Sequence, residues 1–358
     1  MRIEIVNNTN EFLKLGPIWN EIVLAGNHSS IFQSFEWHVS WWNTLRQNEV
    51  MLVLLLYDQN LEAIIPWMIS ERQQYGLSQR VISFIGTGVS DYCDFIYRNP
   101  NKEIFQTVLA WLKNNNDWDL VDLSHLRQDS PTCNGLLTES KTMLCLREKQ
   151  FEAPCILLED QNKAKELLQK QSLKRHYAYF AKKGSLIFKN CQNIQEALLL
   201  LEEFFKQHIS RWESVGITSQ FLKLEQKNFF SELIQKLLPA QWLIFSVVLW
   251  NQIPIAFHIG FEFKKRFIWY KPSFDVTYAK HSPGEVLLKC LLEHAISKEL
   301  SEFDFTIGKE SFKYRFANHI RQVYSLRVYR RRLSYYSAKL LLFSRNSLKQ
   351  LKRVFKKD

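Results

Sequence analysis

The chain repeats one strand–turn–strand pattern at a spacing of roughly 190 residues, and a repeat of this length constrains the possible folds most. The first copy is LLLYDQNLEAIIPW (54–67), and the second is SVVLWNQIPIAFHI (246–259). Each copy has two apolar runs around a short polar turn, which is typical of paired antiparallel strands. In each copy a helix pattern and a further acid-bearing strand pattern follow (WDLVDLSHL and FDFTIG). The sequence therefore predicts two similar α/β domains with mixed sheets, fused in tandem.

The repeat also predicts the domain boundaries. An N-terminal domain is expected over 1–150, a second domain over 151–329 and a separate tail over 330–358, with the first boundary near QFEAPCILLED. The apolar periodicities predict helices over 34–46, 102–113, 161–181 and 193–213, and another helix that starts at Gly284. Apolar runs predict strands at VMLVLLLY, LEAIIPWMIS, RVISFIG, DLVDLSHL, WLIFSVVLW, IPIAFHIGFEF, RFIWYKPSF and FDFTIG.

Composition indicates a globular intracellular chain. Apolar residues make up 46% and charged residues 23% of the 358 positions, which excludes a disordered chain. The six cysteines stand singly without C-x-x-C spacing, so neither a disulfide framework nor a metal site is expected. The N-terminus lacks the apolar run of a signal peptide. The charge-free segment 239–261 is interrupted by WNQIP, which favours two strands over a membrane span. These features predict a cytoplasmic protein.

The basic charge is concentrated in the tail. Residues 330–358 hold ten Lys or Arg and one acid, so about +9 of the net charge of +11 lies there. Apolar residues alternate with the bases from Leu333 to Phe355, which predicts a basic amphipathic helix. Such a helix suits an anionic membrane surface or RNA phosphates, and a terminal helix packed on its own domain is an equal alternative.

The short turn HSPGE precedes the helix that starts at Gly284. A simple helix start explains it, with Ser282 as N-cap, Pro283 in the first turn and Glu285 near the positive end of the helix dipole. The alternative is an anion cradle, because Gly284 lets a ligand approach backbone N–H groups at the helix N-terminus.

An ordered set of motifs resembles a known family. YAKHSPGEVLL followed by FDFTIGKESFKYRF resembles the acetyltransferase domain of the CelD/BcsL cellulose-biosynthesis group, which belongs to the GNAT acyltransferases and is related to the Fem aminoacyl transferases. HISRWESVGITSQF, FQSFEWHVSWW, IIPW and GTGVSDYCDF support the resemblance, which covers nearly the whole chain before the tail. It implies tandem GNAT-like domains that bind acetyl-CoA or another acyl-CoA. It also implies that HSPGE is an anion site formed by Ser282, Gly284 and Glu285, with Tyr270 on the preceding strand as a further cofactor contact.

Acyl transfer to an amine needs a group that stabilises the carbonyl oxygen and a proton acceptor. The resemblance implies the first role for Lys313, which precedes an aromatic residue, although such charged runs are commonly solvated turns. Asp304 and Glu310 are the candidate bases, ahead of His258, which lies on a central strand where a buried structural histidine is the commoner outcome. Proton transfer through water, without a dedicated base, is also open.

Further residues are predicted to bind substrate. His208, Arg211 and Trp212 share one helical face, which lines the cleft in the resembling family, while a buried structural face is the alternative. Arg175 lies on the aromatic helix SLKRHYAYFAKKG, whose basic residues are expected to form a solvated face. The alternative is that Arg175 contacts the acceptor or a phosphate. The remaining candidates, from SDYCD in the first domain, are interpreted as an acceptor-side wall or as turn residues: Asp91, Tyr92 and Asp94.

Three functions remain open at this stage. The first is an acyl-CoA-dependent N-acyltransferase that acts on an amino sugar or a cell-envelope or exopolysaccharide precursor, as the resemblance implies. The second is a Fem-like transferase that uses aminoacyl-tRNA, which the basic tail favours and the nearly neutral remainder disfavours. The third is a catalytically silent assembly factor at the inner membrane face. No G-x-S-x-G, Walker, G-x-G-x-x-G or H-E-x-x-H motif is present, so hydrolase, nucleotide and zinc-protease chemistry is not predicted.

Overall fold

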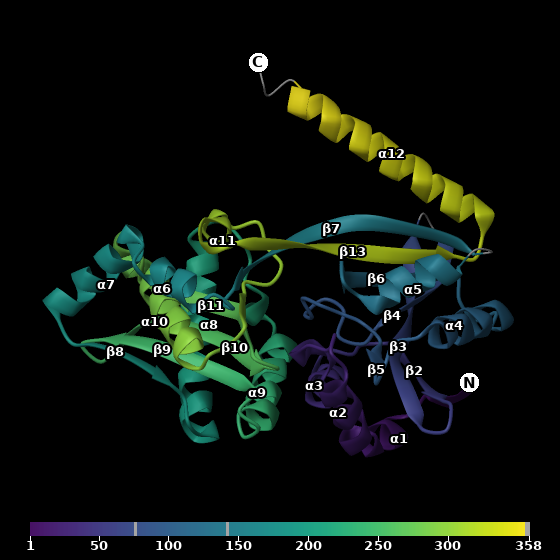
Figure 1. Cartoon of the computed structure of the whole chain (residues 1–358), viewed down its shortest axis with the longest axis horizontal. Coiled ribbons are helices and arrows are strands. Elements are labelled where there is room, and N and C mark those ends of the chain that lie inside the picture. The colour runs from purple at the N-terminus through teal and green to yellow at the C-terminus, as the bar shows by residue number, and fades with distance from the viewer. Residues whose placement is uncertain (75–76, 141–142, 355–358) are drawn as a thin grey trace. The chain divides into compact units, whose positions relative to one another are not determined.

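The computed structural model describes residues 1–74, 77–140 and 143–354. The chain divides into two compact units that each contain helices and strands (Figure 1). Unit 1 comprises Met1–Ser29, Gln47–Gln150 and Gln322–Asp358, and unit 2 comprises Ser30–Arg46 and Phe151–Arg321. The fold is mixed α/β, as the sequence predicts.

These units differ from the expected 1–150 and 151–329 domains in two segments, and the tail that was expected to be separate is assigned to unit 1. Helix α3 (Phe35–Thr44) belongs to unit 2, where the Trp37 ring packs edge-on against Phe229 of α9 with ring centroids 5.2 Å apart. Residues 322–329 of strand β13 (His319–Tyr329) belong to unit 1, because they pair with strand β6. The predicted boundary near QFEAPCILLED falls inside strand β7 (Leu144–Leu157), so the chain passes between the units along a strand and not through a linker.

The strands of unit 1 lie in the order β1-β2-β3-β4-β6-β13, and β5 pairs with β3. All of these neighbours are antiparallel except β4 and β6, which are parallel. The helices and the strands not yet given bounds are α1 (Thr9–Lys14), α2 (Gly16–Ala25), α4 (Lys102–Asn114), α5 (Pro131–Glu139), α12 (Arg332–Val354), β1 (Arg2–Val6), β2 (Val50–Tyr57), β3 (Leu61–Gln74), β4 (Leu77–Phe84), β5 (Ile96–Tyr97) and β6 (Leu120–Arg127).

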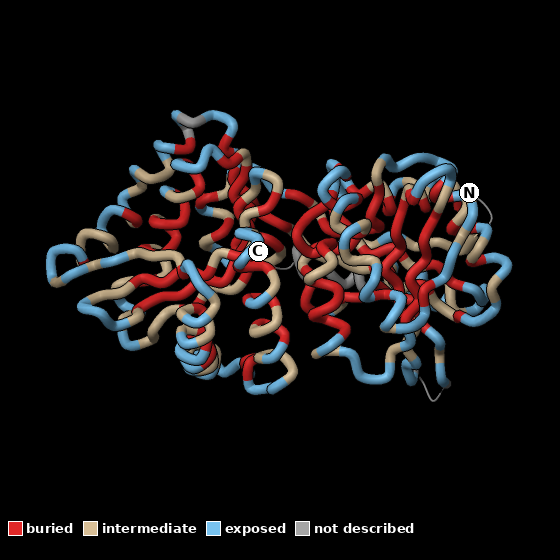
Figure 2. The backbone as a smooth tube through the Cα atoms, turned by 90° about the horizontal axis from the view of Figure 1, so that it is seen from below, coloured by how far each residue is buried: buried red, intermediate tan, exposed pale blue. Residues whose placement is uncertain are grey.

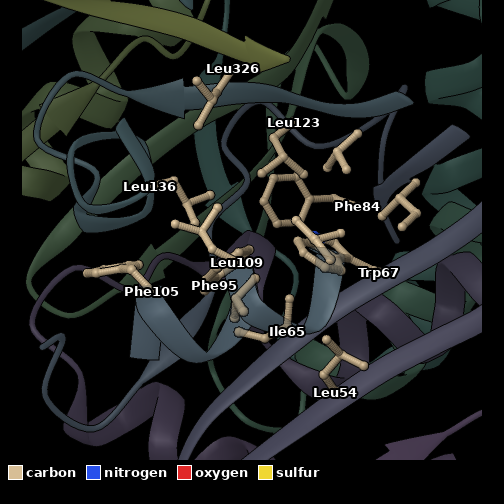
Figure 3. Packing of buried hydrophobic residues seen from close by; sticks show 14 of the residues in the cluster. Leu54, Ile65, Trp67, Phe84, Phe95, Phe105, Leu109, Leu123, Leu136 and Leu326 are labelled. Carbon is tan, nitrogen blue, oxygen red and sulfur yellow. The ribbon is translucent and has the colours of Figure 1, made fainter. Parts of the chain in front are cut away.

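The core of unit 1 forms where these strands bury large side chains. Trp67 of β3 packs edge-on against Phe95 at 5.4 Å, and Phe84 of β4 contacts Phe95 at 6.0 Å (Figure 3). Helix α4 contributes Phe105 and Leu109 to the same cluster, because its apolar residues recur at helical spacing.

The strands of unit 2 lie in the order β7-β12-β11-β10-β9-β8. Neighbours are antiparallel except β11 and β12, which are parallel. The remaining elements are α6 (Gln161–Leu168), α7 (Gln171–Lys183), α8 (Ile194–Glu213), α9 (Leu224–Leu237), α10 (Pro283–Ser297), α11 (Ser311–Phe316), β8 (Leu186–Asn190), β9 (Leu243–Trp250), β10 (Ile253–Phe263), β11 (Arg266–Phe274) and β12 (Glu302–Asp304). In both units the buried stretches follow the strands and the inner faces of the helices (Figure 2).

Most predicted elements are confirmed, and two differ. The predicted helix over 161–181 is two helices, α6 and α7, separated at Gln169 and Lys170. The predicted strand FDFTIG is limited to β12, because the chain turns at Thr306, which has a φ of 57°. The expected basic helix of the tail is confirmed as α12. Within the described residues, no helix combines the length and the apolar character that crossing a membrane requires.

Candidate functional site

A cleft of about 190 Å³ opens in unit 2 where β11 and β12 stop pairing. Their parallel register ends at Ile268 and Asp304, and beyond it the Thr306 hydroxyl donates to the Trp269 carbonyl at 3.2 Å. The second half of β11, the start of α10, Arg211 of α8 and Phe312 of α11 surround the opening. The residues that line it are Arg211, Trp269, Pro272, Ser273, Phe274, Ala279, Ser282, Gly284, Glu285, Leu288 and Phe312.

The start of α10 forms one wall of this cleft. Ser282 has left-handed backbone angles (φ 52°, ψ 59°), and its hydroxyl does not cap the helix, contrary to the expected side-chain N-cap. Pro283 has no N–H, and the Glu285 amide donates to the Ser282 carbonyl at 2.9 Å. Across the described chain, the Gly284 amide has no backbone acceptor, so it is the donor that this helix start offers to a ligand.

Glu285 places a carboxylate beside that amide. Its Oε1 accepts from Arg315 Nη2 at 2.5 Å, and His176 Nε2 lies 4.0 Å from its Oε2. Burial is the largest influence on His176 and lowers the pKa of its imidazole, which favours the neutral ring. The wall thus combines one free amide with one carboxylate, and Arg315 pairs with Oε1 of that carboxylate. The charged run GKESFKYRF contains Arg315, whereas no motif marks His176. The proximity of both residues to Glu285 depends on the folded chain.

The three predicted substrate residues of α8 separate in the structure. Arg211 lines the cleft, its Nη1 donates to the Pro272 carbonyl at 2.9 Å, and its guanidinium lies 4.4 Å from the centre of the Phe274 ring. His208 is buried instead, with Nδ1 2.9 Å from the Ser219 hydroxyl, and Trp212 stacks on it at 5.5 Å. Burial lowers the pKa of His208 to about 3, so this imidazole is neutral.

Tyr270 and Arg175 lie outside the lining of the cleft. Tyr270 is buried on the opposite side of β11 from Trp269, where its ring packs against Trp37 at 5.7 Å and Phe230 at 6.1 Å. Arg175 is exposed on α7, next to His176. The aromatic residues that do line the cleft, Trp269 and Phe274, sit on the same strand as Tyr270. The alternation in RFIWYKPSF could have suggested that this strand presents rings to both sides.

Asp304 is held in a buried ion cluster. Its Oδ1 accepts from the Thr306 amide at 2.7 Å, and its Oδ2 lies 3.6 Å from Arg321 Nη1. Arg321 also makes two hydrogen bonds to Glu302. These contacts engage both carboxylate oxygens of Asp304, and a proton taken up there would compete with them.

His258, the rival base, is fully buried on β10. Its Nε2 accepts from the Tyr270 amide at 3.2 Å, and Gly260 provides the space that the ring occupies. Burial lowers the pKa of this imidazole to about 3, so at neutral pH it does not take up a proton.

Lys313 and Glu310 lie together at the start of α11. The buried Lys313 ammonium donates to the Ile307 carbonyl at 2.8 Å and lies 3.2 Å from Glu310 Oε2. Gly308 leaves room for both groups, since a Cβ there would collide with each of them. The Glu310 side chain is 55% exposed, and its charge acts on the guanidinium of Arg211, a lining residue. Of the three candidate bases, Glu310 is thus the accessible one.

Asp91, Tyr92 and Asp94 belong to unit 1 and therefore not to the unit that holds the cleft. Tyr92 is buried, with the Arg127 guanidinium 5.6 Å from its ring centre. Asp94 Oδ1 accepts from the Phe95 amide at 2.8 Å, and burial raises the pKa of this carboxyl to about 6. Asp94 Oδ1 also accepts from the Tyr97 hydroxyl, so this carboxyl joins several neighbouring groups of unit 1. In the described parts of the chain, no group of three or more metal-ligating side chains occurs.

The region around the cleft matches a known domain family. Residues 169–314 match the model described as "Acetyltransferase (GNAT) domain", and every residue lining the cleft falls within this range. The chain is therefore an acyltransferase. The finer resemblance to the CelD/BcsL group is not part of this match and stays a prediction. A comparison with curated proteins found no match.

Several solved structures share the fold over nearly the whole chain. One is FemX, with a TM-score of 0.60 and 10% identity, covering 89% of this chain and 96% of FemX. Another is a protein of unknown function from Bacteroides thetaiotaomicron (TM-score 0.57, 13% identity, 91% and 100% covered). A third is the C-terminal domain of a putative lysylphosphatidylglycerol synthetase from Agrobacterium fabrum (TM-score 0.55, 12% identity, 92% and 95% covered). At these identities the likeness shows the fold alone.

Proposed function

We propose that the chain is an N-acyltransferase that moves an acyl group from acyl-CoA to an amine on an amino-sugar or cell-envelope precursor. The acetyl group is our first candidate for this acyl group. The observation that carries this proposal is that the cleft between β11 and α10 lies inside the segment that matches the GNAT domain. The lining is mostly apolar, with Trp269, Phe274, Leu288 and Phe312, which suits an acyl chain and its extended thioester arm. The envelope precursor as acceptor rests on the resemblance to the CelD/BcsL group.

The reaction assigns a task to the residues around the cleft. The amine nitrogen attacks the thioester carbonyl and the nitrogen–carbon bond forms. The carbon–sulfur bond breaks, CoA leaves as its thiolate and becomes the thiol on taking up a proton, and the amine loses a proton. Glu310 is our candidate for accepting this proton, because it is exposed and electrostatically coupled to Arg211. The Gly284 amide is our candidate contact for a donor phosphate. Lys313 holds the loop that carries Glu310 through one N–H of its ammonium, which donates to Ile307, and the ammonium is our candidate for acting on the carbonyl oxygen.

A CoA-release experiment tests the proposal. The protein is incubated with acetyl-CoA and a panel of amines that includes glucosamine, and free thiol is measured over time. We expect amine-dependent thiol release that Glu310→Gln lowers and that Glu293→Gln, on the outer side of α10, leaves unchanged. Binding of acetyl-CoA without any amine-dependent release would favour the catalytically silent assembly factor.

A Fem-like transferase that uses aminoacyl-tRNA is the second candidate. One feature of the cleft favours it: the helix start offers the single Gly284 amide, and the Glu285 carboxylate stands next to it. A pyrophosphate binds best where several N–H groups converge and no acid competes with it. A salt-sensitive shift of tRNA on native gels, without binding of CoA, would support this candidate over the first.

Helix α12 suggests where the enzyme works. One stripe of the helix exposes four large apolar side chains: Leu333, Tyr336, Leu340 and Phe343. These residues and Leu341 are 54–80% exposed. The tail also carries most of the net charge. An exposed apolar stripe on a cationic helix suits an anionic membrane surface. We therefore place the chain at such a surface as a peripheral enzyme, with its acceptor a membrane-associated or envelope precursor.

A further inference from the structure

We propose that a basic face beside the start of α10 binds a nucleotide phosphate of the donor. The face consists of Arg175 and Lys183 of α7 and Lys280 of the short 3-10 helix η3 (Val276–His281). This inference rests on the proposed function, because it adds a second phosphate contact to the donor that the cleft holds. The phosphate comes from one of two sources: the 3′-phosphate of CoA, or the nucleotides at the end of a tRNA.

The first observation is positive charge that no acid neutralises. Helix α7 carries four Lys or Arg residues and no Asp or Glu, although the chain outside the tail is nearly neutral. Arg175, Lys183 and Lys280 are exposed, and none of them forms an ion pair with a carboxylate of the described residues. By contrast, Lys206 of α8 and Lys236 of α9 each pair with an acid of their own helix. The basic face is thus open to an anionic ligand.

The second observation is that Arg175 lies next to the cleft. Its Nη2 is 3.4 Å from Nε2 of His176, and the same nitrogen is 4.0 Å from Oε2 of Glu285, a lining residue. The His176 ring also makes a hydrogen bond to the backbone of His281. These contacts join α7 to the start of α10, so the Arg175 guanidinium lies beside the end of the cleft that offers the Gly284 amide.

Two stacked rings bring the lysines of the basic face together. The rings of Tyr179 and His281 lie 3.6 Å apart at their centres, with planes 14° from parallel. The Lys183 ammonium is 4.1 Å from the centre of the Tyr179 ring, and aromatic faces attract cations. Lys280 directly precedes His281 in η3. The stack therefore holds η3 on α7 and places the two lysines on elements that it joins.

The cleft alone offers little to the phosphates of such a donor. Its helix start has the single Gly284 amide, and the Glu285 carboxylate lies next to it. CoA carries a pyrophosphate and a separate phosphate monoester, and a monoester alone holds about −1.5 to −2 charges at pH 7. Hydrogen bonds from Arg and Lys to phosphate are charge-assisted and strong. Three cations beside the amide supply the charge that the amide cannot offset.

A solvated surface without a ligand is the competing explanation. Exposed Lys and Arg keep a protein soluble, and this role needs no particular arrangement of the side chains. It also gives no reason for the affinity of a ligand to depend on one terminal phosphate. The two explanations thus differ in a measurable way.

The test compares CoA with 3′-dephospho-CoA, which lacks only the 3′-phosphate, and uses uncharged tRNA for the other source. Each is titrated into wild type, Lys280→Gln and the double variant Arg175→Gln, Lys183→Gln. The control is Lys206→Gln combined with Lys236→Gln, which removes the same charge from α8 and α9. A second double variant, Arg175→Lys with Lys183→Arg, keeps the charge of the basic face. Thermal melting verifies that each variant is folded.

We expect wild type to bind CoA at least about tenfold more tightly than dephospho-CoA. This preference should be lost in the double glutamine variant, reduced in Lys280→Gln, and kept in the control and in the variant that keeps the charge. If tRNA is the source, its binding follows the same pattern among the variants. No binding of CoA or tRNA, or binding of both that the double glutamine variant leaves unchanged, would overturn the proposal.

The same titrations separate this site from the proposed function. If CoA and dephospho-CoA bind equally and tRNA binding does not depend on the basic face, the phosphate site is refuted and the acyl-CoA donor stands. If neither CoA compound binds but tRNA binding is lost in the double glutamine variant, the acyl-CoA donor is refuted and the phosphate site stands.

Discussion

Arg321 and Glu302 form a doubly hydrogen-bonded ion pair at buried positions, and Arg321 Nη2 donates to Glu302 Oε2 at 2.6 Å. The same guanidinium lies 3.6 Å from Asp304, and Arg266 Nε lies 3.9 Å from Glu302 Oε2, so two acids and two arginines meet at the end of β12. Both acids raise the pKa of Arg321, against the effect of burial. This cluster holds the strand end from which the cleft opens, and it engages the Asp304 carboxylate.

Arg321→Met is therefore expected to destabilise the protein strongly. Glu302 and Asp304 lose the Arg321 guanidinium, while Arg266 Nε stays 3.9 Å from Glu302 Oε2. Breaking a buried ion pair from one side typically costs about 3–5 kcal/mol. Chemical unfolding of wild type and variant measures the difference. Arg72→Met is the control, because its pair with Asp122 is more exposed and is expected to contribute less than about 1 kcal/mol. Equal losses in the two variants would show that the cluster has no special role.

Asp94→Asn is expected to flatten the pH dependence of stability in unit 1. Burial raises the pKa of Asp94 to about 6, so the folded state holds its proton more tightly than the unfolded state does. The resulting stability is fully present below the unfolded pKa near 3.8 and is lost as the pH rises through about 6. Asparagine stays neutral and keeps Oδ1 as the acceptor for Phe95 and Tyr97.

Melting temperatures of both proteins between pH 4 and pH 7 check this prediction. Between pH 4 and pH 7 the free energy of unfolding of the wild type should fall by up to about 3 kcal/mol more than that of the variant. Parallel curves for the two proteins would mean that Asp94 does not titrate in this range.

The elements of the cleft were predictable from sequence because each has a strong local pattern. The strands 253–263 and 266–274 are apolar runs around a polar turn, and α10 starts at a Pro-Gly pair before an apolar-periodic stretch. Four of the residues that the sequence analysis expects at the site line this one cleft: Ser282, Gly284, Glu285 and Arg211. Their positions at a helix start and on one helical face follow from the sequence, whereas their expected role at a ligand site is what the resemblance to the CelD/BcsL group implies.

What could not be predicted depends on contacts between distant segments. The arginine of the buried cluster, Arg321, lies near the start of β13 in a stretch that carries no motif, and Glu302 is 19 positions away from it. His208 and Trp212 share a helical face with Arg211, but only the packing of α8 against β11 decides which of them reaches the cleft. Strands β7 and β13 escaped prediction because polar and charged residues interrupt their apolar residues, so neither sequence contains a continuous apolar run.

Lys313→Ala is expected to lower turnover by about tenfold or more and to leave the affinity for CoA within a few-fold of wild type. Its ammonium holds the Ile307 carbonyl and the Glu310 carboxylate, so its loss frees the loop that positions the proposed proton acceptor. Turnover is measured by thiol release and affinity by calorimetry. Unchanged turnover, or equal losses of turnover and affinity, would contradict this assignment.

Leu333→Gln combined with Leu340→Gln is expected to weaken binding to anionic vesicles by about tenfold or more. These side chains are 80% and 69% exposed, so the substitutions remove apolar surface from the membrane contact without opening the core. Co-sedimentation with vesicles that contain phosphatidylglycerol measures the effect, and the melting temperature should not change.

Leu199→Gln on α8 is the matched control, because Leu199 is 77% exposed but lies on another helix. Equal sedimentation of the double variant and this control, or insensitivity of wild-type binding to salt, would show that α12 does not contact the membrane.

The most direct test of the account is calorimetric titration of CoA into wild type, Gly284→Ala and Gly284→Val. A Cβ at position 284 would lie 3.4 Å from the Phe274 ring, an ordinary contact, so the alanine variant should fold normally while its methyl group enters the cleft. We expect wild type to bind CoA, alanine to weaken binding a few-fold and valine to weaken it by about tenfold or more, because the side chain stands beside the single free amide of the helix start. No binding of CoA by wild type, or equal affinity in wild type and the valine variant, would contradict the claim that this cleft holds the acyl donor.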